Sequence, residues 1–328
     1  MADHRYPHPL LITVAILFLI AVISVLVIPK TANAISSEHW IQLFPAWEDI
    51  INAILEEKNV QAALQNYRDS HHDHPRTGYN IMNLVLEAFP EFRKSEMASA
   101  SVILGLAPAL LQQLSPTYAD TAELAICRPL LAFLVAAGSP AVGLLDPSKC
   151  LNVVKKLEDK HKIGAFEERD STRIEHECTW TDDLAPTIIC LVEYVLAAVA
   201  IANSLHLAYT LGVWAVLSFT PSNTTLPAVW CVTAVLVHLF GWLILDGMTL
   251  GGFLPSRLSL STDRNSVSKG AIAMAFCVYV GCAVQALFGT LVLSSLLFIS
   301  VRDATFIVLR FMASVLICRL LVFMSVDP

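Results

Sequence analysis

The sequence predicts an all-α protein, a polytopic transmembrane helix bundle of six or seven spans with a helical extramembrane region after the first span. Hydrophobic residues make up 55% of the 328 residues and charged residues only 15%, whereas ordinary soluble domains have about 25% charged residues. Long apolar segments alternate with polar ones, and several approach the roughly 20 residues that a helix needs to cross a bilayer. This composition makes membrane lipids the expected partners. The 21 lysines and arginines are scattered along the sequence, so we expect no nucleic-acid partner.

Residues 1–29 are predicted to be an N-terminal anchor or a signal segment. Leu10–Ile28 contains no charged residue, and its length favours an anchor, because the apolar core of a signal peptide usually has about 7–15 residues. The following Ala32-Asn33-Ala34 matches the A-x-A pattern of a signal-peptidase site, so a cleaved signal is the alternative. In that case residues 35–97 are lumenal, and residues 146–184 are cytosolic only if one of two weak membrane segments does not span.

Residues 30–97 are predicted to form an amphipathic helical region outside the membrane. Two apolar stripes recur there at the spacing of one helix face. The first stripe is Trp47, Ile50, Ile51, Ile54 and Leu55, and the second is Ile81, Leu84, Val85, Ala88 and Phe89. Both helices are expected to pack on the transmembrane bundle.

The segment between these two helices, DSHHDHPRTGYN, is rich in residue types that bind metals. The candidate ligands are His71, His72, Asp73 and His74. They are consecutive, whereas metal motifs place histidines one helical turn apart so that their ring nitrogens converge. We therefore expect a solvated linker that binds no metal, and no other part of the sequence indicates a cofactor.

Residues 98–145 contain two weak membrane segments. Ala98–Leu114 is short and interrupted by Pro108, and Leu124–Leu145 carries Arg128 and Pro129. Seven spans result if both segments cross the membrane, and six result if Ala98–Leu114 is re-entrant.

Residues 146–184 form a charged loop of mixed sign, typical of a solvated helix or a mobile loop. Lysine and arginine accumulate on the cytosolic side of membranes. With seven spans, residues 30–97, 146–184 and 246–269 share one side and carry six, seven and three basic residues. The N-terminus is then outside or lumenal and the C-terminus cytosolic. Asn223, in the only N-x-[ST] sequence of the chain, lies on the outer side and is a candidate for glycosylation.

Residues 185–328 are predicted to form a four-span bundle. Ionisable residues inside spans are costly and are therefore functional candidates. Glu193, His238 and Asp246 supply carboxylic acids and a base, which are the groups that proton-transfer chemistry on an apolar substrate needs. Interhelical hydrogen bonding is the alternative use of these side chains. The expected spans are Ala185–Ala208, Leu226–Leu245, Gly270–Leu296 and Thr305–Val326.

The sequence also predicts an intramembrane ion pair. Glu193 lies about eight residues into its span and Arg319 about seven residues before the end of the last span, so both lie roughly 10–12 Å from the same membrane face. An unpaired charge in hydrocarbon costs about 2.5–3.5 kcal/mol on insertion scales. We therefore predict that Glu193 and Arg319 pair inside the bundle. The alternative is that Arg319 reaches the interface and that Glu193 is protonated.

Two resemblances bear on function. The stretch MASASVILGLAPALLQQLSP (97–116), followed by Cys127-Arg128-Pro129 and Ala137-Gly138-Ser139-Pro140, resembles uncharacterised multi-pass membrane proteins of filamentous fungi, and this resemblance implies no activity. The span count and the acidic residues within spans are similar to those of the small integral membrane terpene cyclases of fungal secondary metabolism.

These observations predict a non-enzymatic accessory, scaffold or transport-like component of a membrane. The alternative is a membrane-embedded enzyme of the cyclase or isomerase type, acting on an isoprenoid or lipid intermediate of secondary metabolism with Glu193 as the proton donor. An apolar small molecule is then a further partner. The sequence does not identify protein partners.

Overall fold

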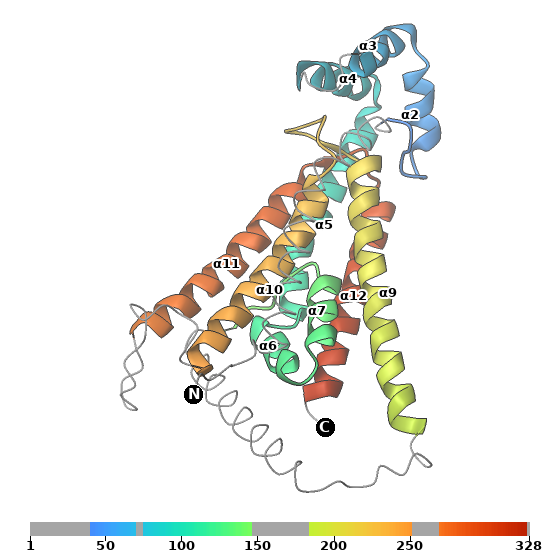
Figure 1. Ribbon diagram of the computed structural model, residues 1–328. Coiled ribbons are helices and arrows are strands. Elements are labelled where there is room, and N and C mark those ends of the chain that lie inside the picture. The colour runs from blue at the N-terminus through green and yellow to red at the C-terminus, as the bar shows by residue number, and fades with distance from the viewer. Residues whose placement is uncertain (1–39, 70–74, 146–183, 251–268, 327–328) are drawn as a thin grey trace, which may run out of the picture.

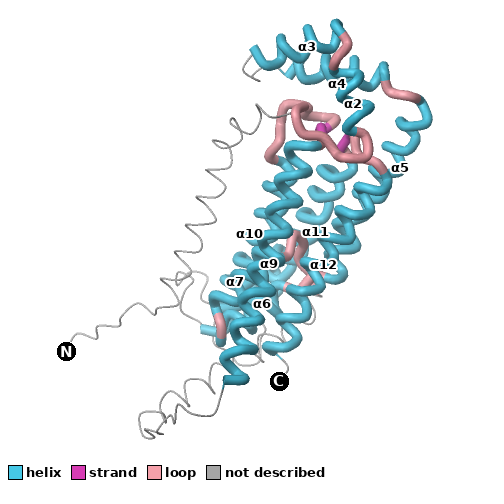
Figure 2. Tube along the Cα trace, turned by 90° about the vertical axis from the view of Figure 1, so that its right-hand side faces the viewer, coloured by secondary structure: helices cyan, strands magenta, loops and turns pink. Residues whose placement is uncertain are grey.

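The computed structural model describes residues 40–69, 75–145, 184–250 and 269–326. They form an elongated helical protein, with five long helices side by side and three short helices stacked on one end (Figures 1 and 2). The short helices are α2 (Glu48–Leu55), α3 (Lys58–Asp69) and α4 (Pro75–Ala88), and together with residues 40–47 we call them the cap. The long helices are α5 (Glu91–Leu114), α9 (Leu184–Trp214), α10 (Leu226–Leu250), α11 (Lys269–Ser294) and α12 (Val301–Val326).

All five long helices are long and apolar enough to cross a membrane. Their outward faces carry large exposed apolar side chains, such as Leu106, Leu287 and Phe323, a surface that lipid covers favourably and water does not. The all-α class and the multi-pass helix composition are therefore confirmed for the described residues. The four spans predicted after residue 184 correspond to α9, α10, α11 and α12, while the apolar run at residues 10–28 lies outside the described residues.

The structure corrects the interpretation of residues 98–145. Ala98–Leu114 is not re-entrant, because α5 continues through Pro108 as a single helix of 24 residues. A proline inside a membrane helix is tolerated where neighbouring helices compensate for the lost backbone hydrogen bond. The first weak segment is therefore a candidate span.

The second weak segment, Leu124–Leu145, is not a span. It falls within two helices of ten residues each, α6 (Tyr118–Cys127) and α7 (Pro129–Gly138), which are separated at Arg128. Each is too short to cross a bilayer. The physical reason is Pro129, because a proline disfavours helical backbone at the residue before it.

The long helices alternate in direction. α5, α10 and α12 run away from the cap, and α9 and α11 run towards it (Figure 1). The connections from α9 to α10 and from α11 to α12 therefore both lie at the cap end. There β1 (Val216–Leu217) pairs antiparallel with β2 (Leu296–Leu297). The last turn of α12 lies at the opposite end, which we call the hairpin end after α6 and α7.

This arrangement corrects the seven-span interpretation. That interpretation assigned two spans to residues 98–145 and so placed residues 30–97 and 218–225 on opposite sides of the membrane. With α5 as the one candidate span there, the cap and residues 218–225 lie at the same end of the bundle. Direct contacts join them, since the Tyr79 hydroxyl donates to the carbonyl oxygen of Phe219.

The cap has its own apolar core, as the two amphipathic stripes predicted. Trp47, just before α2, and Phe89, just after α4, lie edge to face with ring centroids 5.3 Å apart. Phe89 also contacts Phe298, which follows β2. The predicted helices are confirmed as α2 and α4. The sequence interpretation missed α3, which buries Val60 and Tyr67 against them.

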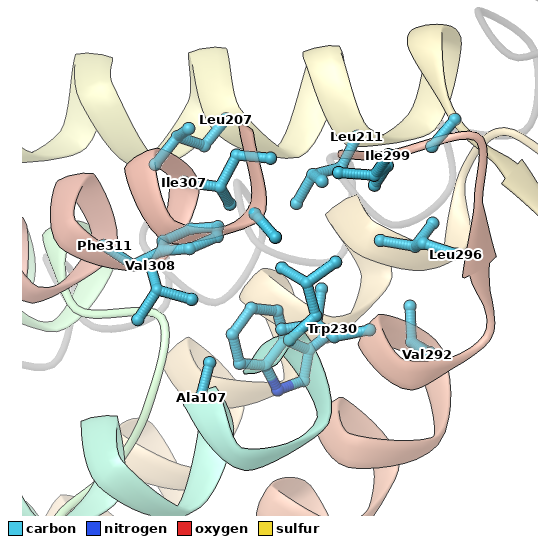
Figure 3. Close-up of a cluster of buried hydrophobic side chains, with 14 of the residues drawn as sticks. Ala107, Leu207, Leu211, Trp230, Val292, Leu296, Ile299, Ile307, Val308 and Phe311 are labelled. Atoms are coloured by element: carbon cyan, nitrogen blue, oxygen red, sulfur yellow. The ribbon is translucent and has the colours of Figure 1, made fainter. Parts of the chain in front are cut away.

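The core of the bundle centres on Trp230 of α10, which side chains from α5, α9, α11 and α12 surround (Figure 3). Its ring stands edge to face against Phe311 at a centroid distance of 5.7 Å. A Cβ atom at Gly289 would lie 2.3 Å from the indole nitrogen. Only glycine therefore lets α11 approach α10 this closely.

Candidate functional site

The α6–α7 hairpin lies inside the half of the bundle away from the cap (Figures 1 and 2). Its two open ends meet, because Thr117 forms a parallel bridge with Gly143 and the Gly143 N–H donates to the carbonyl oxygen of Pro116 at 2.9 Å. A Cβ atom at Gly143 would lie 2.5 Å from the Ser115 carbonyl oxygen. The close approach of the two backbone segments thus requires glycine, and the chain enters and leaves the hairpin at one point.

The two segments that meet there are not helical, and they are buried. Ser115 is 2% exposed and Ser139 is 0% exposed, and their hydroxyl oxygens lie 3.3 Å apart. Hydrocarbon cannot hydrogen-bond to free backbone groups, so irregular backbone at membrane depth occurs only where protein surrounds it or where it lines a polar cavity. This junction is therefore the part of the described bundle where function is to be sought.

Polar side chains from neighbouring helices bind the free carbonyl groups of the junction. Gln285 of α11 donates to the Pro140 carbonyl oxygen at 2.9 Å, and Ser204 of α9 donates to that of Gly138 at 2.8 Å. Both side chains are buried. A buried amide or hydroxyl with a partner is far cheaper than one without, so these contacts fix the hairpin in the bundle.

Two ion pairs connect the hairpin to the long helices. Arg128, between α6 and α7, pairs with Glu193 of α9. Asp120, in the first turn of α6, pairs with Arg319 of α12 at 2.9 Å. Asp120 also accepts from the Thr117 N–H at 2.8 Å while the Thr117 hydroxyl accepts from the Asp120 N–H, so the two residues form a capping box.

The predicted Glu193–Arg319 pair is therefore wrong, because each residue has another partner. Depth along two helices fixes the height of two side chains but not the direction in which they point. Gly138 of α7 lies between α9 and α12, because a Cβ atom added there would lie 3.1 Å from the Cβ of Ala200 and 2.9 Å from the Sγ of Cys318. The hairpin separates the two residues and supplies an opposite charge to each.

His238 of α10 also faces the hairpin and is 2% exposed. Its Nδ1 lies 3.1 Å from the Thr121 hydroxyl oxygen. That hydroxyl donates its single proton to the Tyr118 carbonyl oxygen at 3.0 Å, so it accepts from His238, and the hydrogen-bond network assigns the proton to Nδ1. Nε2 is then an acceptor, and it has no hydrogen-bond partner among the described residues.

The structure places two of the predicted catalytic residues, Glu193 and His238, against the α6–α7 hairpin but not next to each other. Glu193 contacts the hairpin at Arg128 and His238 contacts it at Thr121, seven residues earlier, a separation of about 10 Å along a helix. Asp246 lies in α10, and its side chain is outside the described part.

The remaining predicted sites lie elsewhere. Residues 70–74, with the four disfavoured metal ligands His71, His72, Asp73 and His74, are outside the described residues, and those described contain no group of three histidine, cysteine or acidic residues able to hold a metal ion. Asn223 lies at the cap end, where its side-chain oxygen accepts from the N–H and the hydroxyl of Thr225 at 2.8 and 2.9 Å. Its glycosylation stays a prediction.

Sequence reasoning missed Asp120 and the role of Arg128, although signals for both are present. Thr117-Tyr118-Ala119-Asp120 has the spacing of a capping box, which marks the start of a helix. Pro129 is at the first position of a helix, where proline is favoured. The two helices begin eleven residues apart, at Tyr118 and Pro129, so the second start interrupts the segment that was predicted as one span.

Comparison of the chain with protein-family models, with curated proteins and with solved structures finds no match. The resemblance to membrane proteins of filamentous fungi therefore stays a prediction.

Proposed function

We propose that the protein is a non-enzymatic, transport-like component of a membrane, in which the α6–α7 hairpin is the part that moves. The observation that carries this proposal is the buried, non-helical junction at Ser115 and Ser139. Interrupted helices whose backbone lies inside the bundle are the usual way in which transporters place polar groups near the middle of the membrane.

The two ion pairs support a hairpin that can move. The arginine side chains of Arg128 and Arg319 are 43% and 50% exposed, so each pair has one partner at the edge of the bundle. A pair in this position exchanges its partner for water or a solute at lower cost than a fully buried pair. Opening both pairs, together with the hydrogen bonds from Gln285 and Ser204, would free the hairpin and expose the polar junction behind it to the hairpin end.

The orientation belongs to the same proposal. The hairpin end faces the cytosol, because residues 146–184 carry seven basic residues. The cap and the Asn223 loop then lie outside or in a lumen. This differs from the sequence interpretation in moving residues 40–97 to the outer side, and it agrees with either a cleaved signal or an anchor whose N-terminus is cytosolic.

A disulfide across the junction tests the proposal. The two hydroxyl oxygens are 3.3 Å apart, so the double variant Ser115→Cys/Ser139→Cys needs only a small shift to reach the S–S length of about 2.0 Å. Proteoliposomes containing it are assayed by solid-supported-membrane electrophysiology with chloride, phosphate, sulfate, ammonium and amino acids under a proton gradient. We expect a protein-dependent current that oxidation abolishes and dithiothreitol restores.

The two single cysteine variants are the controls, and oxidation should leave their currents unchanged. A current that survives the disulfide in the double variant would show that the hairpin does not move during transport. The absence of any protein-dependent current would remove the transport proposal itself.

An enzyme acting on an isoprenoid or lipid is the second candidate, and one observation favours it. His238 presents a buried ring nitrogen with a free lone pair, which is what a general base needs. Glu193 suits the role of proton donor less well, because its carboxyl group is engaged in the ion pair with Arg128. Turnover of an isoprenoid diphosphate that is lost in His238→Gln and retained in Glu193→Gln would establish this alternative.

A further inference from the structure

Arg310 differs from the other two arginines in the interior of the apolar segments. Arg128 and Arg319 each have a carboxylate partner. Within the described residues, Arg310 of α12 has none, and its side-chain partners there are an amide and an imidazole. Its Nε and Nη2 donate to Oδ1 of Asn203 at 2.9 and 2.6 Å, and Nη2 lies 3.4 Å from Nδ1 of His206.

The charge lies deep along the helix. Arg310 is nine residues after Val301 and sixteen before Val326, so it lies about 14 Å from one end of α12 and about 24 Å from the other. A guanidinium is always protonated, and a charge near the middle of a membrane helix costs about 2.5–3.5 kcal/mol on insertion scales. The neutral amide lowers this cost without cancelling the charge.

The cluster opens towards the lipid. His206 is exposed and Arg310 is half-buried. Arg310 lies on the outer side of the α9–α12 pair, where its guanidinium carbon is 5.9 Å from the ring of the exposed Phe306. Beside it Ala202 of α9 and Ala313 of α12 are small and exposed, so another helix can approach the seam between α9 and α12 closely.

We propose that this seam binds a transmembrane helix of a partner protein through an acidic side chain that pairs with Arg310. A carboxylate accepts two hydrogen bonds from one guanidinium and cancels its charge. The depth favours a helix over a lipid, because headgroup phosphates lie at the interface, whereas a helix presents its carboxylate at any depth. Asn203 holds the guanidinium towards the seam.

A second copy of this chain does not supply that carboxylate from its described residues. Glu193 lies 21 residues before the end of α9 at Trp214, about 32 Å along the axis, and it is buried against Arg128. Asp303 lies in the first turn of α12, where it accepts from the Ser300 hydroxyl. Neither matches the depth of Arg310, so these carboxylates of a second copy do not pair with it, and the proposal assigns the partner helix to a different protein. This inference is independent of the transport proposal, because it uses the outer face of the bundle and none of the hairpin residues.

The test uses the full chain in phosphatidylcholine nanodiscs and a labelled leucine-rich transmembrane peptide with one glutamate at its centre. Binding is measured by fluorescence resonance energy transfer. We expect this peptide to bind at least about tenfold more tightly than the same peptide with glutamine, because the carboxylate relieves the cost of the buried charge. A peptide with its glutamate one turn from the end should show no such preference.

Protein variants identify the residue. Arg310→Gln should abolish the preference for glutamate, and Arg302→Gln, an exposed arginine at the start of the same helix, should keep it. Asn203→Asp places a carboxylate against Arg310 within the chain, so it should abolish the preference while raising the melting temperature, and it gives a result even if Arg310→Gln does not fold.

Equal binding of the glutamate and glutamine peptides overturns the proposal, and so does a preference that survives Asn203→Asp. Loss of the preference when phosphatidylserine is added would assign the site to lipid and also overturn it.

Discussion

The ion pair between Arg128 and Glu193 gives a prediction in which the two partners are unequal. The Glu193 side chain is 5% exposed, whereas that of Arg128 is 43% exposed. Arg128→Gln leaves a buried carboxylate without its counter-charge. Breaking a fully buried pair costs about 3–5 kcal/mol, and the half-exposed arginine reduces this, so we expect the free energy of unfolding to fall by about 2–3 kcal/mol.

The reverse change should cost less. Glu193→Gln leaves Arg128, whose long side chain can turn towards the interface, and the new amide oxygen still accepts a hydrogen bond from it. We expect a loss of about 1 kcal/mol or less. Both variants are unfolded by titration with sodium dodecyl sulfate in mixed micelles, and the transition is followed by tryptophan fluorescence.

A double-mutant cycle then assigns the partner. The coupling energy between positions 128 and 193 should be about 1–2 kcal/mol, and that between positions 193 and 319 should lie within about 0.5 kcal/mol of zero, as for residues that share no contact. A Glu193→Gln variant less stable than Arg128→Gln would refute the assigned asymmetry. A larger coupling to Arg319 than to Arg128 would refute the pairing itself.

Three further predictions follow from the fold. Gly289→Val should cost about 1–3 kcal/mol through overpacking against the indole ring of α10, whereas Gly281→Val, with nothing within 4 Å of its Cβ position, should be within about 0.5 kcal/mol of the natural protein; equal losses would contradict the packing of α10 on α11. In sealed right-side-out vesicles, a protease site near Lys160 should resist cleavage until the vesicles are permeabilised, while one between α2 and α3 should be cut at once, and the reverse pattern would invert the orientation. The segment at 69–80 should bind no stoichiometric zinc in the purified protein, and zinc that is lost when its histidines are replaced would contradict this.

The sequence by itself determined the class of the protein and most of its helices. The apolar runs after residue 184 are long and almost free of charge, and they became α9 to α12, because a backbone in hydrocarbon satisfies its hydrogen bonds within a helix. The stripe from Trp47 to Leu55 became α2 for an equally local reason, the spacing of apolar residues on one face. Among the described residues, hydropathy failed at Leu124–Leu145, which was predicted as a span and falls within two short helices, whereas Ala98–Leu114 is part of the candidate span α5.

Only the tertiary structure decided which charges meet and which loops share an end. Glu193 lies in the helix that the sequence predicted, but its partner depended on the hairpin, which places Arg128 against α9 and Asp120 against α12. Sequence spacing fixes the height of a side chain along a helix, whereas the direction in which it points and the neighbour it finds there depend on how the helices pack. Which loops share an end with the cap depended in the same way on the number of spans between residues 98 and 145. The structure has one candidate span there in place of two, and each crossing carries every later loop to the opposite side of the membrane.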